Sequence, residues 1–149
     1  MPIAIKDSKI NITSEKLTKE LAKEFTKYLK GGEFSFLYGE MGVGKTTFVK
    51  YFINEYQKIN NVMQTEITSP TFSLLNEYHV KDIRIKHYDL FRINRKEDIN
   101  NLDIFEKDKK LITLIEWPQL LTDTQNIKSI NLTFNYLNDL NDRSVDIKV

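Results

Sequence analysis

The strongest chemical signal in this sequence is a single loop, Gly39 to Thr46, which reads GEMGVGKT. It fits the pattern G-x-x-x-x-G-K-[S/T], in which glycines allow successive backbone N–H groups to point inward at an anion. In such a loop the lysine, here Lys45, reaches the β- and γ-phosphates of a nucleotide, and the next hydroxyl, that of Thr46, coordinates Mg²⁺. The spacing therefore predicts a nucleoside triphosphate site.

Two carboxylates stand where the metal ion of such a site needs an acidic group. Glu116 directly follows the apolar run Leu111 to Ile115, and Asp89 ends an alternating run that begins at Ile83. Ligands of open α/β sheets bind at the carboxyl ends of the strands. We therefore predict a variant metal site in which Thr46 acts with Glu116, with Asp89, or with both. We also expect both carboxylates to stay solvated until the metal arrives.

A third segment, Ser69 to Phe72 (SPTF), carries hydroxyl groups close in sequence to these elements. Such hydroxyls could meet the γ-phosphate or the metal shell, as switch segments do in nucleotide hydrolases. A proline turn capped by serine and threonine explains the same residues equally well. The sequence alone leaves both interpretations open.

Motifs that are absent from the sequence indicate which nucleotide base the site prefers and how fast the isolated chain hydrolyses the nucleotide. GTPases read guanine with N-K-x-D and the γ-phosphate with D-x-x-G, and neither pattern occurs here, so ATP is favoured. No arginine stands out as a built-in finger that would stabilise transition-state charge. We therefore expect low activity from the isolated chain.

Hydrophobic periodicity predicts the elements that must position these residues. Phe34 to Tyr38 is an apolar run typical of a buried strand, and helical spacing resumes from Lys45, so the loop lies between a strand and a helix. The sequence predicts a mixed α/β fold of the P-loop NTPase-like kind, a mixed β-sheet flanked by helices with a C-terminal β-hairpin. Before the loop, the sequence predicts a helix that is capped by Thr13 or Ser14 and ended by Gly31-Gly32. After α-helical spacing ends, it predicts a strand at Phe72 to His79 and another from Ile83, joined across Val80 to Asp82. It then predicts a short helix at Lys96 to Leu102 capped by Asn94, a strand at Leu111 to Ile115, and a hairpin from Ile130 to Val149.

Length and composition set the remaining bounds. The 149 residues predict one domain, 1–149, with a net charge of +1 and no cysteine. Disulfides, zinc–thiolate sites and a thiol nucleophile are excluded, and binding to nucleic acid by bulk charge is disfavoured. No apolar run is long enough to span a membrane, so we expect a cytoplasmic protein with no membrane partner.

Four strings in this order and spacing resemble the TsaE (YjeE) family of small bacterial P-loop ATPases. They are LYGEMGVGKTTF, SPTF, HYDLFR and IEWPQ, which begin at Leu37, Ser69, His87 and Ile115. The resemblance extends over nearly the whole chain. It implies a role in forming N6-threonylcarbamoyladenosine at position 37 of tRNAs that read ANN codons. It further implies that the chain binds a TsaD–TsaB-type complex, which brings tRNA indirectly or at its interface, and uses ATP and Mg²⁺.

The resemblance also implies roles for particular residues. Ser69 to Phe72 corresponds to a first switch segment and Glu116-Trp117 to a second, and Asp89 stands at the Walker B-like position. Thr46 and Glu116, together with Asp89, are the predicted metal ligands, and Lys45, Asp89 and Glu116 are the predicted catalytic residues. The predicted nucleotide-binding residues are Glu15, Thr18, Glu40, Met41, Gly42, Val43, Gly44, Lys45, Thr46, Thr47 and Thr71, of which Glu15 and Thr18 align near the adenine.

Two other functions fit part of the pattern. A small-molecule kinase on a P-loop scaffold is the main alternative, but it normally needs a lid that carries arginines over the phosphates. The segment from Arg92 to Lys110 is short and mixed in charge for such a lid. A nucleotide-dependent binding module that hardly hydrolyses ATP is the third, and nothing in the sequence separates slow from fast hydrolysis.

Overall fold

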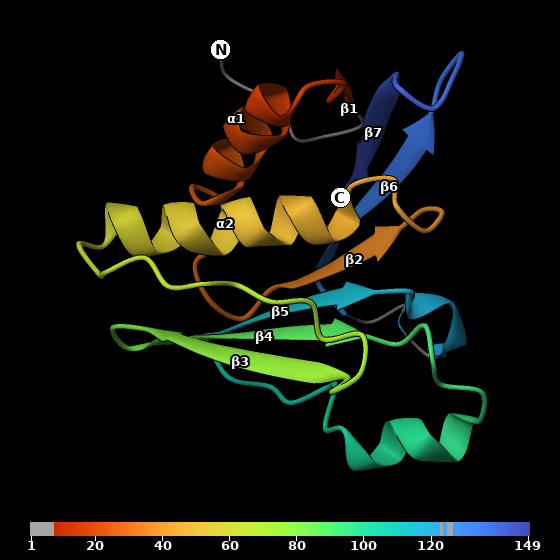
Figure 1. Ribbon diagram of the computed structural model, residues 1–149. Coiled ribbons are helices and arrows are strands. Elements are labelled where there is room, and N and C mark those ends of the chain that lie inside the picture. Colours follow the sequence, from red (N-terminus) through yellow and green to blue (C-terminus); the bar gives the residue numbers. More distant parts are fainter. Residues whose placement is uncertain (1–7, 123, 125–126) are drawn as a thin grey trace.

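A single mixed sheet organises the chain. The structure, a computed structural model, describes residues 8–122, 124 and 127–149. Seven strands pair in the order β1-β7-β6-β2-β5-β4-β3 (Figure 1). The strands are β1 Ser8–Asn11, β2 Phe34–Tyr38, β3 Leu75–Val80, β4 Ile83–Asp89, β5 Leu111–Glu116, β6 Ser129–Tyr136 and β7 Arg143–Lys148. The helices are α1 Glu15–Phe25 and α2 Lys45–Ile59, with the short 3-10 helices η1 Lys96–Asn101 and η2 Pro118–Leu120.

The centre of the sheet is parallel and its two edges are antiparallel. β2 pairs in parallel with both β5 and β6, and β4 pairs in parallel with β5. The hairpins β3–β4 and β6–β7 form the flanks, and β1 adds to β7. The predicted mixed α/β fold with a C-terminal hairpin is therefore confirmed.

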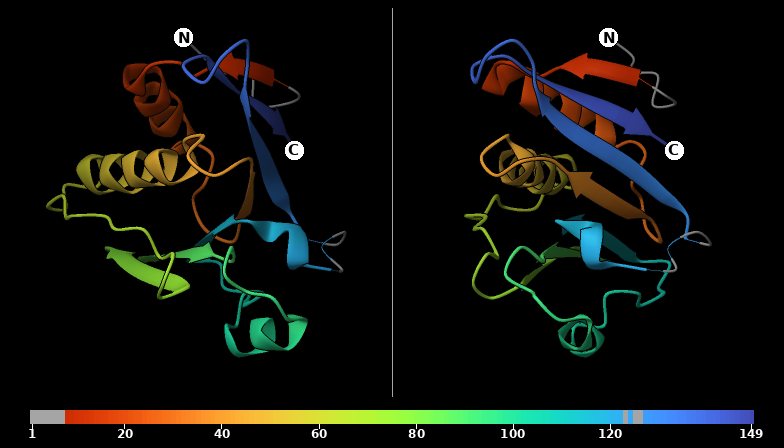
Figure 2. Two further views of the ribbon diagram at one scale, coloured as in Figure 1. Left: turned by 45° about the vertical axis from the view of Figure 1, so that its right-hand side comes forward. Right: turned by 90° about the vertical axis from the view of Figure 1, so that its right-hand side faces the viewer.

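Both faces are covered in the central part of the sheet that holds β2, β5 and β4. The helices α1 and α2 pack on one face, where Phe48, Val49, Phe52 and Ile53 of α2 are fully buried (Figures 1 and 2). Each such side chain contributes about 1.5–3 kcal/mol by leaving water. The segment that contains η1 covers the other face and buries Ile99 against a second apolar cluster. The central parallel strands are therefore buried between two apolar layers.

Most sequence-predicted elements are present, and several boundaries differ. Ser14 caps α1, since its side chain accepts a hydrogen bond from the Leu17 N–H at 3.2 Å. The helix ends at Phe25 and not at Gly31-Gly32, because a turn follows in which Leu29 still packs into the core.

Two further boundaries and one strand were predicted wrongly or missed. The strand predicted from Phe72 begins at Leu75, because a turn precedes it in which the Leu74 N–H bonds the Pro70 carbonyl at 2.7 Å. The short helix is 3-10 and begins after Arg95 without a side-chain cap, so Asn94 is not its cap. The strand β1 was not predicted. Within the described part of the chain, no helix has the length and apolar character needed to cross a bilayer.

Candidate functional site

The glycine loop joins the end of β2 to the start of α2. Gly39 has φ 144°, and a Cβ there would lie 2.8 Å from the Phe134 carbonyl oxygen and 2.9 Å from a Val43 methyl group. Gly44 caps α2 with φ 117°, a conformation that side chains with a Cβ rarely adopt. These two positions require glycine. The loop therefore turns tightly and aims the positive N-terminal end of α2 into a pocket.

Lys45 is held inside this loop and is almost fully buried, with 3% of its surface exposed. Its ammonium donates hydrogen bonds to the carbonyl oxygens of Gly39 and Glu40 and lies 3.8 Å from the centroid of the Trp117 ring. Burial lowers the pKa of Lys45 from its ordinary value, while the Glu116 and Asp89 carboxylates act in the opposite direction. A nucleotide phosphate would give this desolvated cation a stronger partner than two carbonyls.

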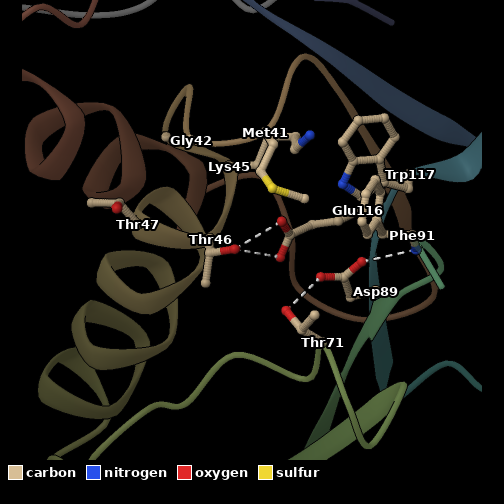
Figure 3. Close-up of a pocket in the computed structure, with 11 residues that line it drawn as sticks. Met41, Gly42, Lys45, Thr46, Thr47, Thr71, Asp89, Phe91, Glu116 and Trp117 are labelled. Atoms are coloured by element: carbon tan, nitrogen blue, oxygen red, sulfur yellow. Dashed lines mark hydrogen bonds between the residues drawn. The ribbon is translucent and has the colours of Figure 1, made fainter.

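Thr46 and Glu116 are in direct contact across the pocket. The Thr46 hydroxyl lies 2.8 Å from Glu116 Oε1 and 3.0 Å from Oε2 (Figure 3). Residue 46 is on the first turn of α2 and residue 116 ends β5, the strand next to β2. The parallel packing of these strands therefore brings together two groups that are 70 residues apart.

Asp89 connects the pocket to the Ser69–Phe72 segment. The Thr71 hydroxyl donates to Asp89 Oδ2 at 3.1 Å, and Asp89 Oδ1 accepts from the Phe91 N–H at 3.0 Å (Figure 3). The Ser69 and Thr71 hydroxyls lie 2.6 Å apart. Asp89 pairs in register with Glu116 on the neighbouring strand, so both carboxylates stand at one edge of the sheet.

The expectation that both carboxylates are solvated is wrong. Asp89 is 5% and Glu116 2% exposed. The reason is that β5 lies between two neighbouring strands, and Thr46 and Thr71 close over the carboxylates from outside the sheet. Both groups are therefore bound to hydroxyls before any metal is present.

Oxygen donors at this corner suit Mg²⁺. The Thr46 hydroxyl and the Glu116 and Asp89 carboxylates are hard ligands, and Mg²⁺ typically takes one or two carboxylates together with phosphate oxygens and water. No group of three or more His, Asp or Glu side chains in the described ranges is placed to hold a metal by itself. A metal ion here would complete its shell with nucleotide oxygens and water.

Trp117 closes the pocket in a strained backbone conformation. It has φ 58° and ψ 55°, a left-handed geometry that is uncommon for a bulky residue and costs on the order of 1–3 kcal/mol. Its ring lies 4.9 Å from the Phe91 ring and covers the Lys45 ammonium. Strain of this kind persists only where the surroundings enforce it, and it is found most often at active sites, ligand clamps and switch segments.

The pocket collects most of the sequence-predicted residues but leaves four outside its wall. It is lined by Met41, Gly42, Gly44, Lys45, Thr46, Thr47, Thr71, Asp89, Phe91, Glu116 and Trp117. Val43 is buried in the core, and Glu40 contributes its carbonyl to Lys45. On α1, Glu15 accepts a hydrogen bond from Tyr51 at 3.0 Å, while the buried Thr18 donates to the Ser14 carbonyl at 3.3 Å. An adenine contact of Glu15 and Thr18 stays a prediction.

Arg143 is a residue that sequence reasoning missed. It begins β7, and its Nη1 atom would lie 3.5 Å from a Cβ built on Gly44, at the N-terminus of α2. Its Nη2 donates to the Thr13 carbonyl at 3.4 Å, while its Nε atom is buried without a hydrogen-bond partner among the described residues. No local motif marks this arginine in the sequence. Its position beside the loop results from the pairing of β7 in the sheet, which local spacing does not reveal.

The fold and the site together define a nucleotide-binding P-loop protein of the α/β class. Comparison with known proteins narrows this class. The family model described as "Threonylcarbamoyl adenosine biosynthesis protein TsaE" matches residues 12–145. The chain therefore belongs to the TsaE family, and the resemblance predicted from its motifs is confirmed.

Individual relatives agree with this assignment. A protein named tRNA threonylcarbamoyladenosine biosynthesis protein TsaE from Rickettsia bellii is 35% identical over 137 residues, which cover 89% of this chain and 90% of that protein. The protein of the same name from Aquifex aeolicus is 36% identical over 108 residues, which cover 72% of this chain and 74% of that protein. The crystal structure of Bacillus subtilis YdiB has the same fold, with a TM-score of 0.71 at 23% identity over 99% of this chain and 88% of that one.

Proposed function

We propose that this chain is the ATP-binding and Mg²⁺-dependent ATP-hydrolysing subunit required to form the threonylcarbamoyl group on adenosine 37 of tRNAs that read ANN codons. It acts with a TsaD–TsaB-type complex and does not transfer the group itself. The observation that carries the proposal is the buried Lys45 beside the Thr46–Glu116 pair, in a chain of the TsaE family. We further propose that the protein works in the cytoplasm.

Each polar group of the pocket has a role in this proposal. The backbone N–H groups at the start of α2 and the Lys45 ammonium bind the phosphates, and both lie where negative charge is favoured. Thr46 and Glu116 hold Mg²⁺, with Asp89 completing the site directly or through water. A metal ion held by these residues would supply positive charge that neutralises the charge developing during phosphoryl transfer.

Thr71 and Trp117 make the pocket responsive to the γ-phosphate. Thr71 is tied to Asp89, so a change at the metal site moves the Ser69–Phe72 segment. Trp117 covers Lys45, so a phosphate that engages the lysine must displace the ring or its contact. A partner that binds one of these arrangements more tightly thereby senses the nucleotide state.

Exposed apolar side chains around the pocket support a protein partner there. Met41 is 61%, Phe91 45% and Phe72 82% exposed, the first two on the pocket wall and the third beside Thr71. Aromatic residues and methionine are enriched in the cores of protein interfaces. A partner that covers this rim would exclude water from the phosphates and supply an arginine finger in trans, which agrees with the expectation that the isolated chain has low activity.

The kinase alternative finds less support. Its lid would come from the segment between β4 and β5, whose arginines are Arg92 and Arg95. Arg92 stacks on the Phe72 ring at 4.2 Å and Arg95 pairs with Asp98 at 3.6 Å, and neither lines the nucleotide pocket. The TsaE family membership favours the ATPase subunit.

Replacing Arg143 by alanine should weaken ATP–Mg²⁺ binding by roughly 10- to 100-fold, because hydrogen bonds to charged groups contribute about 1.5–3 kcal/mol. The arginine stands beside Gly44 at the start of α2, and we propose that it contacts a phosphate of the nucleotide there. Isothermal titration calorimetry measures the change. Arg92→Ala is the matched control, since Arg92 lies on the rim against Phe72. Equal affinities of wild type and Arg143→Ala would remove Arg143 from the site.

Reconstitution tests the function itself. Threonylcarbamoylation of tRNA is followed over many cycles with a TsaD–TsaB-type pair, with and without this chain, and ATP hydrolysis is measured in parallel. We expect this chain to raise the number of tRNA modification turnovers. We also expect the TsaD–TsaB-type pair to raise the ATPase rate of this chain, because assembly can complete a site that has no evident arginine finger of its own. Modification that is equal with and without the chain would contradict the proposed function.

A further inference from the structure

A buried histidine, His87, contacts the Glu116 carboxylate. His87 Nε2 is 2.6 Å from Glu116 Oε2, and His87 is fully buried at 0% exposure. On β4, His87 stands two residues before Asp89, so both side chains project from the same face of the sheet. In the β4–β5 register Asp89 is opposite Glu116 and His87 is opposite Leu114, and the imidazole therefore reaches Glu116 diagonally.

The chemistry of this contact identifies the proton donor. An ionised carboxylate only accepts hydrogen bonds, so the imidazole donates through an Nε2–H. The other ring nitrogen, Nδ1, is buried and has no hydrogen-bond partner among the described residues. A proton on Nε2 and not on Nδ1 avoids a buried N–H group without a partner.

The two oxygens of Glu116 are consequently unequal. Oε2 receives both the imidazole N–H and the longer contact with the Thr46 hydroxyl at 3.0 Å, whereas Oε1 contacts Thr46 alone at 2.8 Å. The imidazole thus binds one oxygen of the carboxylate, whereas Thr46 is the only hydrogen-bond partner of Oε1 among the described residues. Hydrogen-bonding partners of metal-binding carboxylates orient them and tune metal affinity.

We infer that His87 is a positioning residue that fixes the Glu116 carboxylate against Thr46 at the proposed metal site. This inference rests on the proposed function, because it requires Glu116 to serve Mg²⁺. The orientation exists before the metal binds, so ordering the carboxylate costs little when ATP–Mg²⁺ arrives. The contact also couples two adjacent strands at the metal-binding edge of the sheet.

Calorimetric titration of ATP at stepped Mg²⁺ concentrations tests the inference without measuring activity. His87→Leu removes the N–H and keeps an apolar filling, and His87→Gln restores an N–H donor of similar reach. We expect the half-saturating Mg²⁺ concentration to rise about 10- to 100-fold in His87→Leu and to return toward wild type in His87→Gln. ATP binding in EDTA should change little. Ile85→Val, a fully buried neighbour on the same strand, controls for loosening of the core.

A folded His87→Leu variant with an unchanged Mg²⁺ dependence would overturn the inference. If that variant does not fold, nitrogen-15 NMR of the wild-type imidazoles decides. We expect an Nε2–H tautomer for His87 whose resonance moves when Mg²⁺ is added to the ATP-bound protein, while the exposed His79 stays unaffected. An Nδ1–H tautomer, or a resonance that Mg²⁺ does not move, would refute the inference. If wild-type binding of ATP is itself independent of Mg²⁺, the proposed metal site fails, and the inference fails with it.

Discussion

Lys45→Ala is expected to abolish productive ATP binding. The ammonium is desolvated, with 3% exposure, and is held by two loop carbonyls and an aromatic ring until phosphate replaces them. Two charge-assisted hydrogen bonds of about 1.5–3 kcal/mol each correspond to a loss in affinity of roughly 100-fold or more. Calorimetric titration with ATP–Mg²⁺ measures the change. The same variant should fail to support repeated rounds of tRNA modification with the partner pair.

Lys50→Ala provides the control for this experiment. Lys50 lies on the same helix but is exposed on its outer side, so its removal should leave ATP affinity near that of wild type. If Lys45→Ala binds ATP–Mg²⁺ with near-native affinity, the assignment of Gly39 to Thr46 as a phosphate-binding P-loop is wrong. Equal support of tRNA modification by wild type and Lys45→Ala would show that ATP use has no role in it, and the kinase alternative would then have to be reopened.

Glu116→Gln and Asp89→Asn should each lose most Mg²⁺-dependent ATP turnover. An amide keeps the shape of the carboxylate but loses the charge that attracts the metal. Removing a residue that hydrogen-bonds a metal ligand typically lowers metal affinity or activity by about 10- to 100-fold, and loss of a direct ligand should lower it at least as much. Because only Glu116 contacts Thr46, we expect Glu116→Gln to raise the Mg²⁺ requirement more than Asp89→Asn does. ATPase assays over a range of Mg²⁺ concentrations test both expectations.

The stability of these variants shows whether the loss is chemical. Both amides retain hydrogen-bonding partners, so we expect melting temperatures without nucleotide to stay within about 2–4 °C of wild type, the shift that about 1 kcal/mol produces in a domain of this size. Glu55→Gln is the matched control, since Glu55 is also buried, at 4% exposure, but belongs to α2 and pairs with Lys19 at 3.8 Å. If a variant unfolds instead, the carboxylate that it lacks is needed for the stability of the fold, and its assignment to the metal site is wrong.

The local parts of the site follow from the sequence. Gly39 to Thr46 is contiguous, and its conformation depends on glycines and on the strand and helix that flank it. The continuous apolar run before Glu116 and the alternating run that ends at Asp89 predict strand ends, because the side-chain pattern is a local property. The same reasoning predicts the hairpins. This reasoning did not predict that β3 begins at Leu75, because the Pro70–Leu74 turn competes with extension of the strand.

Only the tertiary structure decided which groups touch. The contacts of Thr46 with Glu116 and of His87 with Glu116 join residues 70 and 29 positions apart, and the approach of Arg143 to Gly44 depends on the position of β7 in the sheet. Strand order and register set these contacts, and neither is encoded in local spacing. Burial is decided in the same way. The sequence marked Asp89 and Glu116 as strand ends, but the neighbouring strands and the hydroxyls above them removed these carboxylates from water.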